Sequence, residues 1–289
     1  MNVGVIGAGR IAHIVIPTVQ QLPGITCLAI ASREKERAEE FAKEHGIPKA
    51  YGSYEELLQD PEIDLVYIAT PHSHHCEQML QCIEHGKAVL SEKAFTANAE
   101  QAKKVREYAA KKGVFVAEAI WTRYMPSRKV IQEMLDSGII GEVRFLTANL
   151  FYDIDDKERL VRRDLCGGAL LDVGVYGLNF ALMHFGQDLE KVESSVQMTE
   201  GGVDGQENIT YDTSVKTITV TVTDDLQGAL VASVEGSIEF VNTYTEKEYP
   251  PTPPTDDRSN LAAMMVLMMS AICGCAFVVK KKKEEAWEE

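Results

Sequence analysis

The stretch VGVIGAGRIA at residues 3–12 predicts a strand, a glycine turn and a helix in immediate succession. Gly7 permits the tight turn, and Gly9 lets backbone N–H groups approach a pyrophosphate. The helix N-terminus adds the positive end of a dipole, and the small Ala12 suits the third position of the glycine pattern. The stretch therefore predicts a dinucleotide site, with an ordinary strand–helix turn as the alternative. The residues of this turn expected at the cofactor are Gly7, Gly9, Arg10, Ile11 and Ala12.

Length and composition are typical of a two-domain α/β enzyme. The chain has 289 residues, enough for two cores, and its 29 basic against 44 acidic residues give a net charge of −15, which disfavours nucleic-acid partners. The first strand begins at Asn2, so we expect no secretory signal. The six cysteines form no C-x-x-C pair, which predicts reduced thiols in a cytoplasmic protein.

The end of the second predicted strand, residues 25–31, indicates which dinucleotide would bind. It leads into Ser32 and Arg33 at the place where NAD-binding folds usually carry an acidic residue for the ribose hydroxyl. A hydroxyl followed by a guanidinium suits a 2′-phosphate instead. We therefore predict NADP, with NAD as the alternative if Arg33 merely begins the solvated helix expected at residues 34–44.

A histidine-rich segment follows the strand predicted at residues 64–69. This segment, TPHSHH at residues 70–75, lies at the carboxyl end of the strand, where open α/β sheets bind their ligands. Consecutive residues point in different directions, and the sequence shows no matching ligand cluster, so no metal site is predicted. The last histidine is expected to open the next helix, residues 76–85, with its ring near the cofactor. The residues expected at the cofactor here are Thr70, Pro71 and His75.

A lysine follows the strand predicted at residues 88–91, within Glu92-Lys93-Ala94. At the carboxyl end of a strand in such a sheet, Lys93 can hydrogen-bond a substrate hydroxyl, stabilise an alkoxide or take part in proton transfer. The alternative is a surface lysine whose ammonium group reaches the solvent.

Several separated segments together resemble one enzyme family. They are GAGRIA at 7–12, TP at 70–71 with His75, EK at 92–93, EAIWTRY at 118–124 and GGALLDVGVY at 167–176. In this order and spacing they resemble the glucose–fructose oxidoreductase and inositol dehydrogenase (Gfo/Idh/MocA) family over residues 1 to about 210. The last two segments are most similar to its dimeric dihydrodiol dehydrogenase and NADP-dependent D-xylose dehydrogenase branch.

The resemblance implies roles for individual residues. Lys93 matches the catalytic lysine of the family, followed here by Ala94 where the family commonly has proline, and Tyr176 matches the acid/base tyrosine. Asp172, four residues earlier on one predicted helical face, would orient the substrate or the lysine. The ammonium group would lower the pKa of the tyrosine from about 10 toward working pH. The resemblance also places Glu92, Trp121 and Arg123 beside the cofactor, with a packed crossover strand as the alternative for the last two.

The implied function is hydride transfer between NADP and a secondary alcohol or carbonyl of a sugar, cyclic polyol or trans-dihydrodiol. A non-catalytic NADP-binding sensor or scaffold is the alternative. Both need the glycine turn, but only the enzyme needs Lys93 and Tyr176 together, and their joint presence favours it. A membrane-tethered interaction module ranks last.

The sequence predicts two domains of different architecture. Residues 1–120 are expected to form a Rossmann domain with a doubly wound parallel sheet. Residues 121–289 are expected to form an α+β substrate domain with an open, mostly antiparallel sheet, which in the family pairs subunits into a homodimer. A helix at residues 168–184 and strands at 214–223 and 229–240 belong to it.

The last part of the chain, residues 249–289, is atypical. A proline-rich stretch at 249–255 precedes Leu261 to Val279, an apolar segment long enough to cross a membrane and followed by four lysines. The lysines favour an orientation that would place the cofactor domain outside. We therefore expect a buried helix, with a membrane anchor or an aberrant C-terminus as the alternatives.

Overall fold

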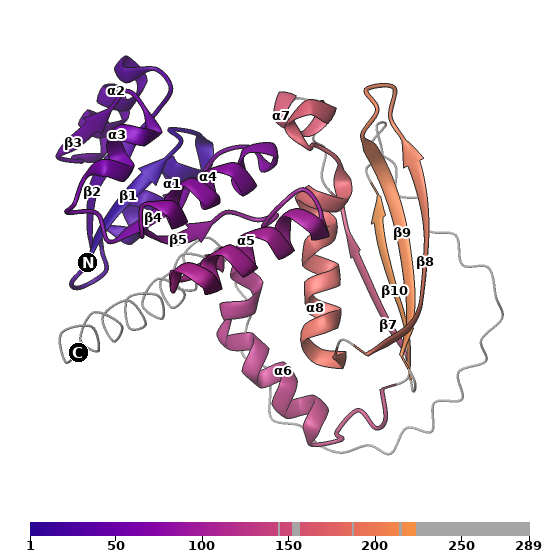
Figure 1. Cartoon of the computed structure of the whole chain (residues 1–289). Coiled ribbons are helices and arrows are strands. Elements are labelled where there is room, and N and C mark those ends of the chain that lie inside the picture. The colour runs from indigo at the N-terminus through magenta and orange to yellow at the C-terminus, as the bar shows by residue number, and fades with distance from the viewer. Residues whose placement is uncertain (144, 152–156, 187, 214–215, 224–289) are drawn as a thin grey trace.

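The computed structural model describes residues 1–143, 145–151, 157–186, 188–213 and 216–223, which form two sheets joined by helical segments (Figure 1). The strand expected at 229–240 and the apolar segment from Leu261 to Val279 lie outside the described residues.

The first sheet has six parallel strands in the order β3-β2-β1-β4-β5-β6. This is the doubly wound order, in which the chain reverses direction across the sheet between β1 and β4. The glycine turn and the histidine-rich segment follow these two strands, so both lie at the edge where such folds bind ligands. The strands are β1 (Asn2–Ile6), β2 (Thr26–Ala31), β3 (Lys49–Tyr51), β4 (Leu65–Ile68), β5 (Ala88–Ser91) and β6 (Val116–Glu118).

Helices cover both faces of this sheet, and the strands are apolar on both sides as a result. Along β4, Leu65 and Tyr67 pack into one hydrophobic cluster while Val66 and Ile68 pack into the other. The sheet is therefore packed on both faces, and this packing holds the strand ends from which the glycine turn and the histidine-rich segment follow. The helices are α1 (Arg10–Val19), α2 (Lys35–His45), α3 (Tyr54–Gln59), α4 (His72–Glu84) and α5 (Ala99–Lys112).

The first half also contains elements that were not predicted or that begin elsewhere, among them β3 and α4. The short β3 was not predicted, because three half-buried residues carry too little pattern. Helix α4 begins at His72 rather than at residue 76, and Pro71 occupies its N-cap. Its buried side chains include His72, His75, Cys76 and Met79. Their helical spacing was obscured because two of them are histidines.

The second sheet has the order β7-β10-β9-β8, with β10 parallel to β7 and antiparallel to β9. Strands β8 and β9 are antiparallel, so the predicted open, mostly antiparallel sheet is confirmed. Helix α8 lies over one face of this sheet (Figure 1). The strands are β7 (Phe145–Leu150), β8 (Leu189–Met198), β9 (Asp204–Thr213) and β10 (Lys216–Thr223), and α8 spans Val175–Phe185.

Short helical segments join the two sheets and place the second half against the first. The helix predicted at 168–184 begins instead with a π-helical turn, Leu170–Gly174, before α8. π-Turns of this kind insert a residue and re-aim the side chains around them. The remaining segments are η1 (Trp121–Tyr124), α6 (Pro126–Asp136), α7 (Glu158–Val161) and η2 (Arg163–Leu165).

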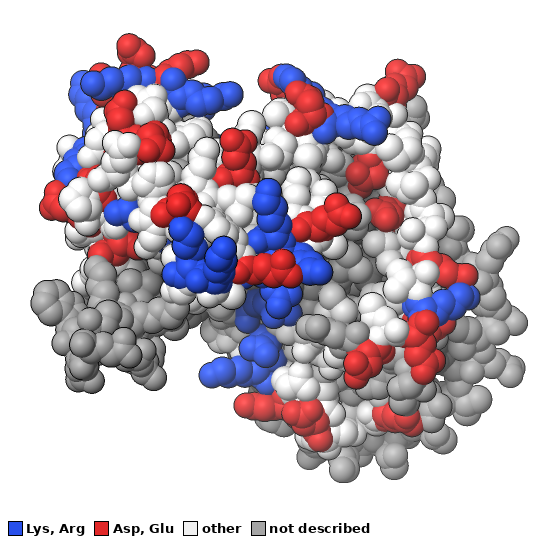
Figure 2. Space-filling view, in the orientation of Figure 1, with Lys and Arg blue, Asp and Glu red and all other residues white. Residues whose placement is uncertain are grey.

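The run Arg163–Phe185 is long and apolar enough to cross a membrane by length and composition alone, and a third of its most apolar window is buried. It contains Asp172, which pairs with Lys93. On the face shown in Figure 2, acidic and basic side chains of the described residues are interspersed.

Candidate active site

A pocket of about 550 Å³ opens at the carboxyl ends of β1, β2, β4 and β5. The glycine turn, the residues after β2 and β4, and Lys93 after β5 line it. Lys157 and Arg159, from the start of α7, line it from the second half of the chain. Residues from both halves of the chain therefore line the predicted cofactor site.

The glycine turn has the shape that a bound phosphate requires. Gly7 has φ +101°, and a Cβ there would lie 2.9 Å from the carbonyl oxygen of Ala69, so only glycine fits. Gly9 takes the N-cap of α1 without a side-chain cap among the described residues. The first N–H groups of α1 are thus open to an anion, and Arg10 adds a positive charge beside them.

A group of polar and basic side chains also lines the pocket. Ser32, Arg33, Arg37 and Tyr54 all line it, and Arg37 Nη2 donates to the carbonyl oxygen of Ala8 at 3.0 Å. Burial raises the pKa of Tyr54, and the charges of Arg33 and Arg37 partly offset that effect. Sequence reasoning missed Arg37 and Tyr54. Arg37 could have been found, because it lies in the first turns of the helix predicted directly after Arg33.

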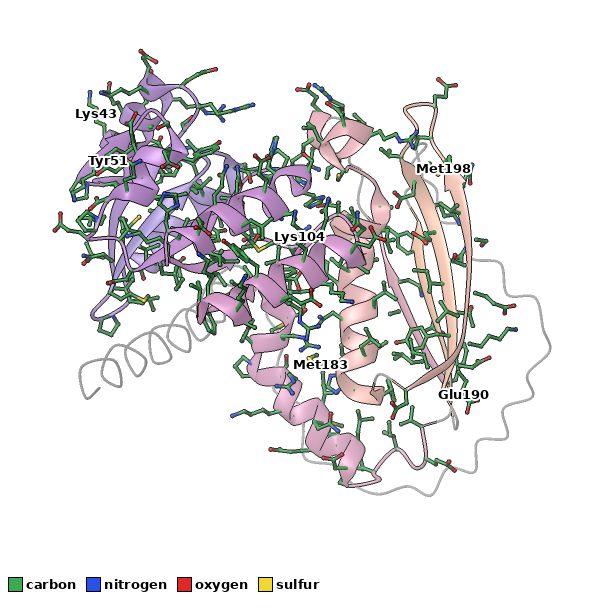
Figure 3. The ribbon with its side chains drawn as sticks, viewed as in Figure 1. Lys43, Tyr51, Lys104, Met183, Glu190 and Met198 are labelled. Atoms are coloured by element: carbon green, nitrogen blue, oxygen red, sulfur yellow. The ribbon has the colours of Figure 1, made fainter. Side chains whose placement is uncertain are left out.

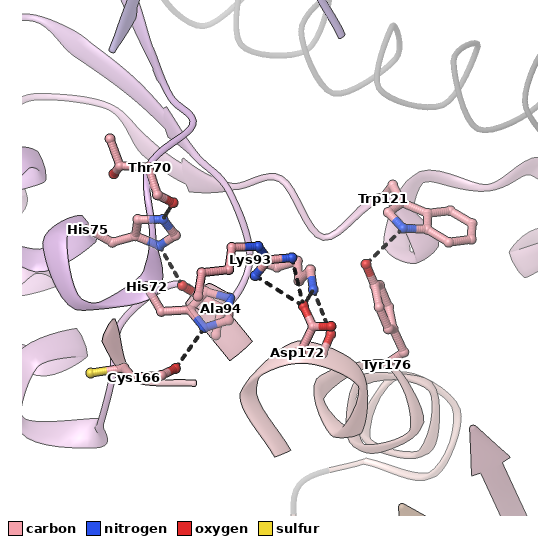
Figure 4. A network of polar contacts seen from close by, with 10 residues as sticks. Thr70, His72, His75, Lys93, Ala94, Trp121, Cys166, Asp172 and Tyr176 are labelled. Carbon is pink, nitrogen blue, oxygen red and sulfur yellow. Dashed lines mark hydrogen bonds and ion pairs between the residues drawn. The ribbon is translucent and has the colours of Figure 1, made fainter. Parts of the chain in front are cut away.

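Lys93 is held by an aspartate from the second half of the chain (Figure 4). Its Nζ donates to Asp172 Oδ1 at 2.8 Å and also to the carbonyl oxygen of Asp172. Arg159 Nη2 lies 3.4 Å from the same Oδ1. Burial raises the pKa of Asp172, but the charges of Lys93 and Arg159 outweigh it and hold this pKa below its ordinary value. Asp172 is therefore an anion that fixes the ammonium group in place.

The π-turn accounts for the position of Asp172. Gly168 has φ +116°, and a side chain there would overlap the carboxylate of Asp204. Asp204 Oδ2 accepts a hydrogen bond from the N–H of Leu170, the first residue of the turn. The glycine thus lets β9 anchor the turn that carries Asp172.

Tyr176 lies beside Lys93, at the start of α8. The ammonium nitrogen is 5.2 Å from the centroid of the tyrosine ring. The tyrosine Oη accepts a hydrogen bond of 3.1 Å from Trp121 Nε1. A positive charge over the ring and a donor on the oxygen both stabilise a phenolate. The structure thus brings together Lys93, Asp172 and Tyr176, as the sequence predicted.

Two further carboxylates lie near Lys93, the buried Glu92 and the half-buried Glu118. Glu92 lines the pocket, and its Oε1 accepts a hydrogen bond from the Tyr67 hydroxyl. Burial raises the pKa of Glu92, partly offset by the bond from Tyr67. Glu118 accepts a hydrogen bond from the N–H of Phe95 at 2.7 Å. Glu118 thus holds the backbone that follows Lys93, and Glu92 links the end of β5 to β4.

His72 also lines the pocket, although sequence reasoning did not select it. Its Nδ1 lies 3.0 Å from the carbonyl oxygen of Cys166, 94 residues away in the sequence. Burial lowers the pKa of His72 to about 4, which keeps the ring neutral at pH 7. A contact this distant leaves no local signal in the sequence.

We expect His72 to make the protein less stable in acid. The unfolded chain binds a proton near pH 6.5 and the folded chain only near pH 4, so stability is fully present above pH 6.5 and is lost as pH falls. His72→Gln keeps a donor for Cys166 but does not titrate. Between pH 7 and pH 4, the free energy of unfolding in urea should fall by about 3 kcal/mol more in the wild type than in this variant. Equal losses in both proteins would contradict the assignment.

Four of the predicted cofactor residues, Ala12, His75, Trp121 and Arg123, do not line the pocket, and their contact with a cofactor stays a prediction. The His75 ring is fully buried, with Nδ1 2.7 Å from the Ala94 carbonyl and Nε2 2.9 Å from that of Thr70. Trp121 donates a hydrogen bond to Tyr176, and Arg123 Nε donates one to Asn179 Oδ1 at 3.2 Å, so both side chains contact α8. Ala12 is buried in α1 beneath the turn, and the other predicted cofactor contacts line the pocket: Gly7, Gly9, Arg10, Ile11, Ser32, Arg33, Thr70, Pro71, Glu92 and Lys93.

Two family models match the chain in succession. Residues 1–119 match an oxidoreductase family with an NAD-binding Rossmann fold, and residues 129–251 match the GFO/IDH/MocA C-terminal domain. The chain belongs to the Gfo/Idh/MocA oxidoreductase family. The sequence resemblance is confirmed, and so is the fold that it implied.

Relatives of this family member include curated enzymes and solved structures. The trans-1,2-dihydrobenzene-1,2-diol dehydrogenase of Mus musculus is 41% identical over 204 residues, which cover 70% of this chain and 61% of that enzyme. The human enzyme is 36% identical, over 83% of this chain and 74% of that enzyme. A 3-ketoreductase from Actinomadura kijaniata, solved with NADP and TDP-benzene, superposes with a TM-score of 0.74 at 31% identity, over 78% of this chain and 70% of that one. The match to the mouse enzyme thus spans about three fifths of its length.

Proposed function

We propose that this chain is an NADP-dependent oxidoreductase that interconverts a secondary alcohol and a ketone. One observation carries the proposal: Lys93 lines the cofactor pocket and is fixed by Asp172 while its ammonium group lies over Tyr176. A protein that only bound the nucleotide would need the glycine turn but not this triad. The sensor or scaffold alternative is therefore disfavoured.

The residues of the pocket fit the proposed cofactor. The N-terminus of α1, with Gly7, Gly9 and Arg10, would hold the pyrophosphate, and Ser32, Arg33 and Arg37 would hold a 2′-phosphate. Bound NADP would supply or accept the hydride. The sequence expectation of NADP gains support from Arg37, a further guanidinium that lines the pocket with Arg33, and from the NADP-bound ketoreductase.

Tyr176 would exchange the proton of the substrate hydroxyl at its Oη. The Trp121 Nε1–H group and the Lys93 ammonium group both favour the phenolate form that accepts this proton. Asp172 would not touch the substrate in this role. It holds the ammonium group of Lys93 in place through two hydrogen bonds.

We propose a cyclic diol, sugar or polyol as the substrate, since the relatives named above act on a dihydrodiol or are called a 3-ketoreductase. The test is to follow NADPH fluorescence while aldoses, inositols and trans-dihydrodiols are added, with NADP and with NAD. Turnover of one class is expected. Tight NADPH binding without turnover of any of them would favour the sensor.

Cofactor choice can be tested at Arg33. Arg33→Ala should weaken NADP binding by about 10- to 100-fold, the loss of a charge-assisted bond to a phosphate, and leave NAD binding unchanged. Lys35→Ala is the matched control, because it removes an exposed positive charge two residues further along. Fluorescence titration measures both affinities. Equal weakening of NAD and NADP would show that Arg33 does not contact the 2′-phosphate.

We also propose a homodimer formed through the second sheet. Strand β8 is an edge strand, and Val192, Val196 and Met198 on one side of it are 57%, 52% and 56% exposed. Met198 projects from the end of β8 in Figure 3. Apolar side chains on an edge strand favour a protein partner. Light scattering at micromolar concentration should give twice the chain mass, and a monodisperse monomer would contradict the proposal.

A further inference from the structure

Two histidines and a glutamate meet where α1 and α2 lie side by side, and none of them lines the cofactor pocket. His13 Nδ1 and His45 Nε2 are 2.8 Å apart. Glu44 Oε1 lies 3.5 Å from the first nitrogen and 3.7 Å from the second. Within the described ranges, no other group of three such ligand atoms converges in this way.

The surrounding residues hold the two imidazole rings in position. The buried ring of Phe41 lies 4.4 Å, centroid to centroid, from each histidine ring. Gln20 Nε2 donates to the carbonyl oxygen of His45 at 2.7 Å, and the His45 side chain is only 10% exposed. Much of the ordering that a bound ligand would otherwise impose on these rings is therefore already present.

The distances suit a tetrahedral cation. Zn²⁺ binds imidazole nitrogen and carboxylate oxygen at about 2.0–2.2 Å, which places neighbouring ligand atoms about 3.3 Å apart. Both nitrogen–oxygen distances are close to this value, and the two nitrogens need to separate by about half an ångström. The largely exposed Glu44 and the partly exposed His13 can make this adjustment. Two imidazoles and one carboxylate with a free fourth position form a donor set that Zn²⁺ favours.

We propose that His13, Glu44 and His45 bind a Zn²⁺ ion that links α1 to α2. A water molecule would complete the coordination. Because the ion binds both helices only in the folded chain, it stabilises the first domain by mass action. The site is separate from the proposed catalysis. It differs from the sequence expectation of no metal, because His13 is 31 residues from Glu44 in the sequence and only the fold brings them together.

The test is calorimetric titration of the untagged, metal-stripped full chain with ZnCl₂. We expect one binding event that His13→Gln weakens at least about tenfold, because one of three ligands is lost. His85→Gln is the matched control, since His85 also pairs with a glutamate, at 3.2 Å from Glu55, but lacks a third ligand. The control should bind Zn²⁺ as the wild type does.

Thermal unfolding gives a second measurement of Zn²⁺ binding, and it also shows whether each variant is folded. Zn²⁺ should raise the Tm of the wild type and of His85→Gln but not of His13→Gln, whose partly exposed side chain can be replaced without opening the core. Equal affinity for Zn²⁺ in the wild type and in His13→Gln would overturn the proposal. So would the absence of any Zn²⁺ binding by the wild type, which would leave a hydrogen-bonded histidine pair only.

Discussion

Lys93→Met should abolish turnover while the fold and NADPH binding persist. Methionine keeps the length of the side chain but removes the charge that lies 5.2 Å from the Tyr176 ring and 2.8 Å from Asp172. The phenolate and a developing alkoxide both lose their cationic partner, and the loss of such groups costs about 10²- to 10⁴-fold in rate. We expect kcat to fall by at least about 10³-fold. Steady-state kinetics at saturating NADP measures it, with fluorescence titration of NADPH beside it.

The matched control is Lys104→Met, which removes a lysine from α5, away from the cofactor pocket (Figure 3). It should keep wild-type kcat. If Lys93→Met retained kcat within about tenfold of the wild type, Lys93 would be only a structural partner of Asp172.

Tyr176→Phe should lower kcat by about 10²- to 10⁴-fold, the usual contribution of a positioned acid or base. Phenylalanine keeps the ring beneath the ammonium group and removes only Oη, so Lys93 and Asp172 keep their contact. Trp121 Nε1 loses its acceptor, which accounts for at most a small change in stability. The readouts are kcat, the Kd for NADPH and the Tm.

Tyr108→Phe provides the control, because Tyr108 lies on α5 with its ring near Lys112 and has no part in the pocket. A fully active Tyr176→Phe enzyme would show that another group moves the proton.

If Lys93 and Tyr176 act as one unit, the kcat of the double variant should be hardly lower than that of the slower single variant.

The fold of the first half could be predicted because its signals are local. The glycine turn and the apolar strands are each encoded within a few residues, and alternation of strands with helices is typical of a doubly wound sheet. The triad was predicted only through the family resemblance, because Lys93 and Asp172 are 79 residues apart.

The residues that were missed depend on distant contacts. His72 is hydrogen-bonded to the carbonyl oxygen of Cys166, which lies far from it in the sequence. Arg159, on α7, contacts Asp172 in the π-turn. The π-turn before α8 depends on Asp204, in a strand that follows it in the sequence. The helix predicted over the apolar segment, Leu261 to Val279, falls outside the described residues, and the cytoplasmic location stays a prediction.

The way Asp172 holds Lys93 also limits what the lysine can do for a substrate. An ammonium group has three N–H bonds, and the main-chain and side-chain oxygens of Asp172 accept from two of them. One N–H group remains for a substrate, so Lys93 can donate a hydrogen bond to only one oxygen of a ring that carries several hydroxyls. Regiochemistry would then be set by one lysine rotamer, and a substitution that freed a second N–H should blur which carbon of the substrate is oxidised.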